Sequence, residues 1–414
     1  MRSVFLVPLC FGLLVPACGE DGGSVDSATG GGSDGGSSTS GGAEPTSGDA
    51  PTTGEDASTG TSGASTTGEP TTGAEETTGE PSPWDGEPLP EAPPGEWIWV
   101  DFPDALCRDG STTGIGVRYG TGDGLVIYFM GGGACFNVQT CALNPARFSG
   151  SDFEGSSSGI FDPSANNPVG DWSFVFVPYC TGDVHAGDRP DQNSPAGIQQ
   201  FVGYRNVAAY LERIVPTFTG VEHVLVTGES AGGFGAAFNY DRIADAFPGT
   251  AVTLLDDSGP PLGFEVVPLC LQQQWSDLWG LEDTIPADCE GCFPSQGGGV
   301  VNIGRYIAKK HKDQRLALIS STGDSVIRFF FGFGANDCSA IIPNTPQEAF
   351  EAALLDLREK YFNEPPGVWG SFFVGNSEQH TWLSGSYYSA STNGVSLVEW
   401  VGQLIAGEAT HVGP

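Results

Sequence analysis

One serine stands in a sequence context that suits a nucleophile. Residues 224–235 read VLVTGESAGGFG, so that an apolar run leads into Ser230, which has glycine two positions before it and two after it. Such a G-x-S-x-G pattern can carry a reactive serine on a sharp turn between a strand and a helix. Glycine makes up 62 of 414 residues, and the same pattern also surrounds Ser33 and Ser157. Only Ser230 lies between a predicted buried strand and a predicted helix, so we predict that it is the nucleophile rather than a serine that merely caps that helix.

A serine hydroxyl is a weak nucleophile and needs a general base. His380 follows the last predicted strand and comes after Ser230, as the chain order serine, acid, histidine requires in an α/β hydrolase. His185 also follows a predicted strand, but it precedes the serine. We therefore predict His380 as the base, with His185 as the alternative. The other histidines are expected to be structural or solvated: His223, His311 and His411.

A carboxylate is expected to orient the imidazole and to stabilise its cation. Asp324 follows the predicted strand 315–320 and would lie on the same rim of the sheet as His380. We predict Asp324 as this acid. The alternatives are Asp256, Asp257 and Asp337.

Backbone N–H groups are expected to stabilise the oxyanion of a tetrahedral intermediate. The sequence MGGGAC at 130–135 follows a predicted strand, and such a glycine run can leave its N–H groups free. We predict Gly132 and Gly133 as donors, together with the N–H of Ala231. Asp183 and His185, on a neighbouring loop, are predicted to contact the substrate.

These residues need a frame that brings strand ends together. Short apolar runs typical of strands buried on both faces occur at 124–130, 174–178, 223–227, 250–255, 315–320 and 370–374. Helical periodicity occurs at 197–215, 233–247, 345–361 and 395–405. This alternation predicts an α/β-hydrolase-like, doubly wound and mostly parallel sheet, with the site outside the carboxyl ends of its strands.

The chain is divided by composition. Residues 1–18 read as a signal peptide whose end, Val15-Pro-Ala-Cys18, resembles the lipobox of bacterial lipoproteins, in which the cysteine carries the lipid. Residues 19–95 are rich in Gly, Ser, Thr, Pro and acids, and predict a disordered tether. Residues 96–414 are long enough for one catalytic domain. We expect an exported protein on the cell surface or the outer membrane, anchored only through Cys18, with a secreted protein as the alternative.

Charge and cysteine content limit the partners. The formal net charge is −35, with +1 on residues 1–18, −15 on residues 19–95 and −21 from residue 96 onward, so nucleic acid is excluded as a partner. Up to four disulfides are expected in an exported domain, with their pairing open, and no metal or other cofactor is predicted. Cys289 and Cys292 have the spacing of half a zinc site, but no second half accompanies them. The eight cysteines of the domain are Cys107, Cys135, Cys141, Cys180, Cys270, Cys289, Cys292 and Cys338.

An ordered set of motifs resembles the pectin acetylesterase and Notum carboxylesterase family. The motifs are CRDGS at 107–111, GGGACFN at 131–137 with Cys141, VPYCTGD at 177–183, GESAGG at 228–233, DSG at 257–259 and QHT at 379–381. The resemblance implies a serine carboxylesterase with a triad at Ser230, Asp324 and His380, and the glycine run as oxyanion hole. Two positions depart from the family pattern: Ala134 where tryptophan is usual, and Glu229 where a small or sulfur-bearing residue is commoner.

We therefore expect hydrolysis of acyl esters, with a short acyl group such as acetyl and a polysaccharide as the candidate alcohol. The departures leave both pectin acetate and a lipid-modified protein unassigned as substrate. Two alternatives belong to other classes. One is a non-catalytic surface protein that binds carbohydrate or mediates adhesion, and the other is a lipase or peptidase on the same fold.

Overall fold

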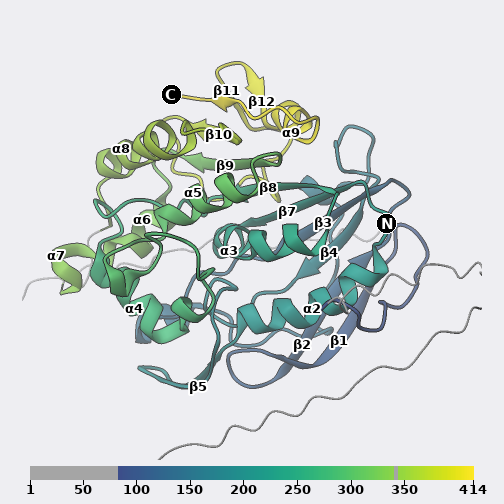
Figure 1. Ribbon diagram of the computed structural model, residues 1–414, viewed down its shortest axis with the longest axis horizontal. Coiled ribbons are helices and arrows are strands. Elements are labelled where there is room, and N and C mark those ends of the chain that lie inside the picture. Colours follow the sequence, from purple (N-terminus) through teal and green to yellow (C-terminus); the bar gives the residue numbers. More distant parts are fainter. Residues whose placement is uncertain (1–82, 340–343) are drawn as a thin grey trace, which may run out of the picture. The chain divides into compact units, whose positions relative to one another are not determined.

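A nine-stranded sheet forms the centre of the computed structural model, which describes residues 83–339 and 344–414 (Figure 1). The strand order is β1-β2-β4-β3-β7-β8-β9-β10-β13, in which β1, β2 and β4 pair antiparallel and the remaining pairs are parallel. The strands are β1 (Trp97–Leu106), β2 (Thr112–Arg118), β3 (Gly124–Phe129), β4 (Ser173–Val177), β7 (His223–Glu229), β8 (Ala251–Asp257), β9 (Arg315–Ser321), β10 (Trp369–Val374) and β13 (His411–Val412). This is the doubly wound, mostly parallel sheet predicted from the sequence.

Helices and two short hairpins complete the domain. The helices are α1 (Val138–Leu143), α2 (Gly203–Thr217), α3 (Ala231–Ala246), α4 (Leu269–Trp279), α5 (Val301–Lys310), α6 (Ser325–Gly332), α7 (Ala335–Cys338), α8 (Gln347–Leu357) and α9 (Leu397–Ile405). A π-helical turn spans Arg358–Phe362, and 3₁₀ turns span Gly159–Phe161, Leu281–Asp283 and Pro294–Gln296. The hairpins are β5 (Arg189–Ser194) with β6 (Gly197–Phe201), and β11 (Ser391–Thr392) with β12 (Val395–Ser396).

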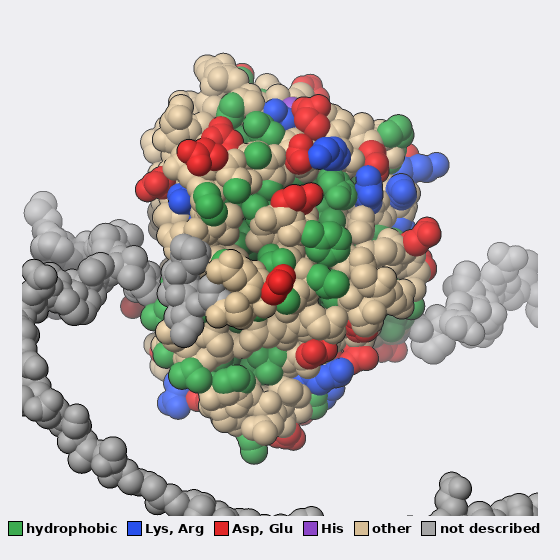
Figure 2. All heavy atoms as spheres, turned by 90° about the vertical axis from the view of Figure 1, so that its left-hand side faces the viewer, with side chains coloured by type: hydrophobic (Ala, Val, Ile, Leu, Met, Phe, Trp, Pro, Cys, Tyr) green, Lys and Arg blue, Asp and Glu red, His purple; other side chains and the backbone are tan. Residues whose placement is uncertain are grey.

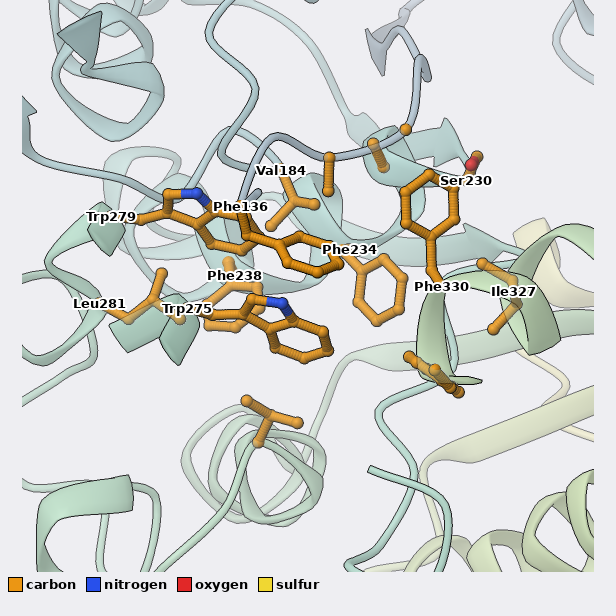
Figure 3. A pocket seen from close by; sticks show the side chains of 15 residues that line it. Phe136, Val184, Ser230, Phe234, Phe238, Trp275, Trp279, Leu281, Ile327 and Phe330 are labelled. Carbon is orange, nitrogen blue, oxygen red and sulfur yellow. The ribbon is translucent and has the colours of Figure 1, made fainter. Parts of the chain in front are cut away.

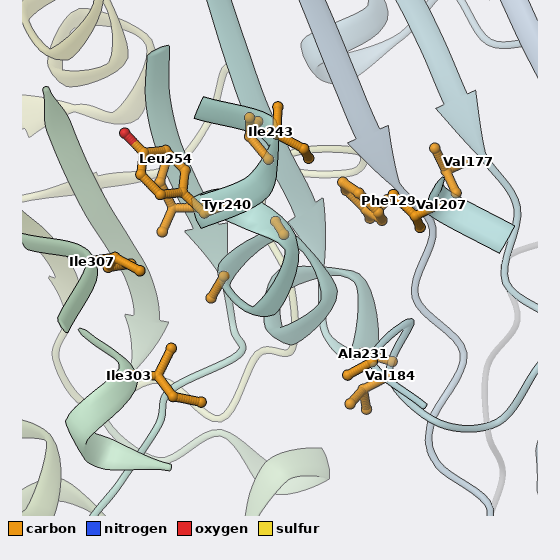
Figure 4. Close-up of a cluster of buried hydrophobic side chains, with 14 of the residues drawn as sticks. Phe129, Val177, Val184, Val207, Ala231, Tyr240, Ile243, Leu254, Ile303 and Ile307 are labelled. Atoms are coloured by element: carbon orange, nitrogen blue, oxygen red, sulfur yellow. The ribbon is translucent and has the colours of Figure 1, made fainter. Parts of the chain in front are cut away.

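The sheet buries both faces because its central strands carry apolar side chains on both sides. Successive side chains of a strand point to opposite faces. In β3, Leu125 and Ile127 join the larger core with α2, α3 and α5, whereas Val126 and Tyr128 join the smaller core with α9. Figure 4 shows part of the larger core, in which Tyr240 and Ile243 of α3 lie near Leu254 of the sheet and Ile303 and Ile307 of α5.

One predicted helix begins later than expected. The sequence predicts a helix over 197–215, but residues 197–201 form β6, and α2 begins only at Gly203. Gly197 adopts φ +91°, a left-handed conformation that glycine accepts readily and that here turns the chain back into a hairpin. The Gln200 N–H then bonds the Arg108 carbonyl at 3.0 Å, a distant contact that no local pattern indicates.

The ordered domain begins before the predicted boundary at residue 96. Leu89 is only 4% exposed, and its backbone N–H donates to Thr217 Oγ1 at 2.7 Å. Gly86 N–H likewise donates to the Glu212 carbonyl in α2. Residues 86–89 therefore pack on α2. The predicted end of the tether at residue 95 is wrong, because these residues belong to the folded domain.

The predicted signal segment, Cys18 and the tether up to residue 82 lie outside the described residues. Within the described ranges, no helix is both long enough and apolar enough to cross a bilayer.

Four disulfides pair the eight cysteines of the domain, as an exported chain was expected to allow. The pairs are Cys107–Cys180, Cys135–Cys141, Cys270–Cys338 and Cys289–Cys292. The Cys135–Cys141 pair links the segment just after the glycine run to α1, and Cys107–Cys180 links the end of β1 to the loop after β4.

Candidate active site

Ser230 lies on a sharp turn between β7 and α3. Its φ of +59° and ψ of −122° are unfavourable for a residue with a Cβ, which is the strained geometry of a nucleophile elbow. The turn is held by the Ser230 N–H, which donates to the Asp257 carbonyl at 2.7 Å. A Cβ at Gly228 would come within 2.4 Å of the Gly232 carbonyl oxygen, and one at Gly232 within 2.0 Å of the Phe129 carbonyl oxygen. The glycines of the motif are therefore required by close backbone packing.

The glycine run lies directly over this turn. A Cβ at Gly131 would lie 3.1 Å from the Cβ of Ser230, and Gly133 adopts φ +78°. In the part of the chain that the structure describes, no hydrogen bond engages the backbone N–H of Gly132 or Gly133. Ala231 is the first residue of α3, where an N–H has no partner inside the helix. The three predicted donors thus have unused N–H groups beside the serine.

His380 and Asp324 are hydrogen-bonded to each other. The Nδ1–H of His380 donates to Asp324 Oδ2 at 2.8 Å, and the carboxylate is fully buried. The other oxygen, Oδ1, accepts the N–H groups of Val326 and Ile327 and so caps α6. The capping bonds fix the carboxylate, and the carboxylate in turn fixes the imidazole.

The pKa of His380 is raised above its usual value near 6.5. Burial of the ring lowers this pKa, but the hydrogen bond and the charge of Asp324, with the charges of Asp257 and Glu229, outweigh the effect of burial. Nδ1 therefore keeps its proton beside Asp324, which leaves Nε2 as the nitrogen that can accept a proton.

The competing acids have other partners. Asp256 Oδ1 accepts the Gly259 N–H, and burial raises the pKa of this carboxyl to about 8. Asp257 accepts backbone N–H groups from the residues that follow His380, and Asp337 is exposed on α7. Among the four candidate carboxylates, only Asp324 bonds the imidazole.

Asp183 and His185, the predicted substrate contacts, are both buried in the protein next to the glycine run. Asp183 is fully buried and accepts from the Thr181 hydroxyl and the Gly203 N–H, and burial raises its pKa to about 6. His185 is 2% exposed, and burial lowers its pKa to about 4, so the ring is neutral. Its Nε2 bonds the Met130 carbonyl at 2.9 Å, just before the glycine run. The polar atoms of both side chains therefore face protein groups, and the bond from His185 to Met130 supports the loop of the glycine run.

An apolar pocket extends from Ser230. It holds about 590 Å³ of space between protein atoms, part of it open to solvent. Figure 3 shows Ser230 at one end of the lining, beside Phe330 and Ile327 of α6, with Trp279 and Leu281 at the other end. The labelled lining is apolar apart from the serine itself: Phe136, Val184, Phe234, Phe238, Trp275, Trp279, Leu281, Ile327 and Phe330. Sequence analysis missed this pocket, although Trp275 and Trp279 stand one helical turn apart in α4.

The face that carries α4, α6 and α8 exposes hydrophobic side chains among polar ones (Figure 2).

Elsewhere in the described residues, the remaining histidines have structural partners, as expected. His223 bonds Thr253 Oγ1, His411 bonds Ser371 Oγ, and His311 bonds Asp241 Oδ1. Asp241, Asp245 and His311 are close enough together to hold a metal ion, but the ammonium group of Lys310 already bonds both carboxylates.

Residues 100–284 match the family model described as pectinacetylesterase. A palmitoleoyl-protein carboxylesterase, Notum of Mus musculus, is 30% identical over 169 residues, which cover 37% of this chain and 33% of that protein. Pectin acetylesterase 5 of Arabidopsis thaliana is 29% identical over 169 residues, which cover 37% of this chain and 39% of that protein. The crystal structure of the Wnt deacylase Notum from Drosophila is similar in fold, with a TM-score of 0.56, 19% identity, and coverage of 76% of this chain and 97% of that chain.

The matched segments thus span between 33% and 39% of these two curated relatives. The family model includes the glycine run and Ser230, but it ends before Asp324 and His380. For Asp324 and His380, the prediction is therefore supported by the hydrogen bond between them and not by the family match.

Proposed function

Because residues 100–284 match the pectinacetylesterase family model, we propose that this chain is a serine carboxylesterase with Ser230 as nucleophile, His380 as general base and Asp324 as the orienting acid. The observation that carries the proposal is the His380–Asp324 hydrogen bond on the rim where Ser230 occupies a strained turn. Ser230 Oγ attacks the acyl carbon while His380 Nε2 takes its proton. The same imidazolium then donates this proton to the departing alcohol, and water repeats the sequence on the acyl-enzyme.

The glycine run and the start of α3 supply the oxyanion hole. When the carbonyl carbon becomes tetrahedral, its oxygen gains negative charge that fixed N–H groups can stabilise. The N–H groups of Gly132, Gly133 and Ala231 are free for this purpose. His185 supports their loop through the Met130 carbonyl, and Asn144 supports it through a 2.8 Å bond from Nδ2 to the Gly132 carbonyl.

The apolar pocket favours an acyl group longer than the acetyl group expected from the sequence. The pocket starts at Ser230 and is lined by aromatic and aliphatic side chains, so an alkyl chain loses contact with water as it enters. An acetyl group would leave most of this lining without a partner. We therefore propose a medium-length or longer apolar acyl chain as the substrate group.

Activity is expected to rise along a series of p-nitrophenyl esters as the acyl chain lengthens from acetyl. Each added methylene is expected to raise kcat/KM by about fourfold, from ~0.8 kcal/mol of burial per methylene, until the pocket is filled. The control is Leu281→Phe, which adds volume at the end of the lining opposite Ser230 and should shift the optimum to a shorter chain. A profile that falls steadily from acetyl onward would contradict this acyl assignment without contradicting esterase activity.

The acid limb of kcat/KM is expected to lie above pH ~6.5, the usual pKa of histidine. The pKa of His380 is raised, so the imidazolium, which cannot accept the serine proton, persists to a higher pH than usual. Activity is present above this pKa and is lost as the pH falls through it. A pH–rate profile with a stable short-chain ester measures this acid limb. An inflection well below the usual pKa of histidine would contradict a raised pKa for His380 as the base.

We also propose that the protein is exported. Four disulfides in one domain are typical of proteins that fold in an oxidising compartment. The lipobox-like end at Cys18 supports a lipid anchor, and Cys18→Ala would then release the protein from membranes with its turnover unchanged.

A further inference from the structure

Two buried carboxyl groups stand side by side at the ends of β7 and β8. Glu229 and Asp257 are register partners in these neighbouring parallel strands, and they are 8% and 0% exposed. Among the described residues, neither forms an ion pair with lysine or arginine. A buried carboxyl pair without a cation is costly and calls for a specific use.

The pair binds three consecutive backbone N–H groups just after His380. Asp257 Oδ2 accepts from Trp382 at 2.6 Å and from Leu383 at 2.9 Å. Glu229 Oε1 accepts from Ser384 at 2.8 Å. The segment 382–384 is therefore attached to the strand ends that carry the serine turn.

The other oxygen of each carboxyl group also accepts a hydrogen bond. The Tyr128 hydroxyl donates to Glu229 Oε2 at 2.6 Å, and the Ser258 hydroxyl donates to Asp257 Oδ1 at 2.9 Å. Asp257 also binds the nucleophile turn, because its carbonyl accepts the Ser230 N–H. A single residue thus contacts both the turn of the serine and the loop of the histidine.

The loop needs such anchors because its backbone is strained beside His380. Thr381 adopts φ +66°, which is a genuine outlier for a β-branched residue and persists only where surrounding contacts impose it. On the other side of His380, the Ser321 hydroxyl donates to the Gln379 carbonyl at 2.6 Å. His380 is therefore held on one side by the end of β9 and on the other side by the two carboxyl groups.

We propose that Glu229 and Asp257 form a positioning pair that holds the backbone after His380 and so sets the imidazole against Ser230. The proposal rests on the esterase function proposed above. Glu229 is the residue directly before Ser230, and this use gives a physical reason for a carboxyl group at that position.

The pair also has an electrostatic consequence. Burial, and then the charge of Glu229, raises the pKa of Asp257 well above its usual value. The charges of Asp257 and Glu229 act with Asp324 to raise the pKa of His380. Tyr128, whose own pKa burial and these two carboxyl groups raise, is the other titratable group in contact with the pair and stays neutral.

Alanine and amide variants separate positioning from general stability. Glu229→Ala leaves the Ser384 N–H unpaired, and a displaced imidazole is expected to lower kcat on the order of 10²-fold with KM little changed. Glu229→Gln can still accept from Ser384 and can donate to the Tyr128 oxygen, so it should keep at least about a third of the parental kcat. Asp257→Ala and Asp257→Asn should show the same contrast. If Asp257→Ala does not fold, the comparison of Glu229→Ala with Glu229→Gln tests the proposal. The control is Asp241→Asn, which weakens the α3–α5 ion pairs away from the site and should lower thermal stability but not kcat.

The pH profile adds a readout that a merely structural role would not change. The double variant Glu229→Gln/Asp257→Asn removes both carboxyl groups whose charges raise the pKa of His380, so its acid limb should move to lower pH.

Folded alanine variants with parental kcat would overturn the proposal, and so would a double variant with an unmoved acid limb. Ser230→Ala is measured alongside. An inactive Ser230→Ala with a fully active Glu229→Ala would refute the positioning pair alone, whereas ester hydrolysis by Ser230→Ala would refute the proposed function.

Discussion

Replacement of Ser230 by alanine is expected to lower kcat for ester hydrolysis on the order of 10⁴- to 10⁶-fold. The substitution removes the attacking oxygen and leaves the turn intact, since serine and alanine meet the same strain at φ +59°. In the described structure, no hydrogen bond involves Ser230 Oγ, so its loss leaves no buried group without a partner. Hydrolysis of a short-chain and a medium-chain ester, with circular dichroism as the check on folding, measures the effect.

Ser157→Ala is the matched control for this experiment. Ser157 has the same glycine spacing, but it lies exposed on a loop rather than after a buried strand. Its replacement should leave the rate unchanged. If Ser230→Ala retained the parental rate, the covalent mechanism would be wrong, and a protein that binds esters or carbohydrate without turning them over would become the better description.

His380→Ala is expected to be nearly as severe as Ser230→Ala, because the serine cannot lose its proton without a base. The two losses should not add, so the double variant should be about as active as either single variant. Asp324→Asn should lower kcat by about 10⁴-fold, because an amide cannot hold the imidazole in the required tautomer. Its Oδ1 can still accept from Val326 and Ile327, so α6 keeps its cap.

Asp324→Ala separates the two roles of this carboxylate. It removes the cap as well, which should cost about 1 kcal/mol of stability beyond the loss of rate. His411→Ala is the control for removal of a histidine, since His411 bonds only Ser371 in β10. An active His380→Ala enzyme would exclude His380 as the base.

The predictions that the structure supports came mainly from patterns among residues that are close together in the sequence. The run before Ser230 predicts β7 because seven residues suffice to show a buried strand, and the glycines after it predict the turn because backbone crowding leaves no room for a Cβ. Chain order then placed His380 and Asp324 on one rim, since the carboxyl ends of parallel strands meet at the same edge.

Contacts between distant residues could not be predicted in this way. Leu89 lies in a segment of tether-like composition, yet its burial on α2 depends on residues more than a hundred positions away. Asp183 and His185 were predicted to face substrate because their loop follows a strand, but only the packing beneath Met130 decides where their side chains point. Pairing of the eight cysteines was equally open, because spacing alone does not bring sulfur atoms together.

The sequence by itself determined the fold class, the serine turn, the glycine run and the placement of Asp324 and His380 at one edge of the sheet, because each depends on local backbone preference or on strand direction. Only the tertiary structure decided that Asp324 rather than Asp257 bonds the imidazole, that an apolar pocket begins at Ser230, and that Glu229 and Asp257 hold the histidine loop. Adjacent strand ends present several carboxylates within reach of one imidazole, and side-chain direction, fixed by packing across the sheet, selects among them.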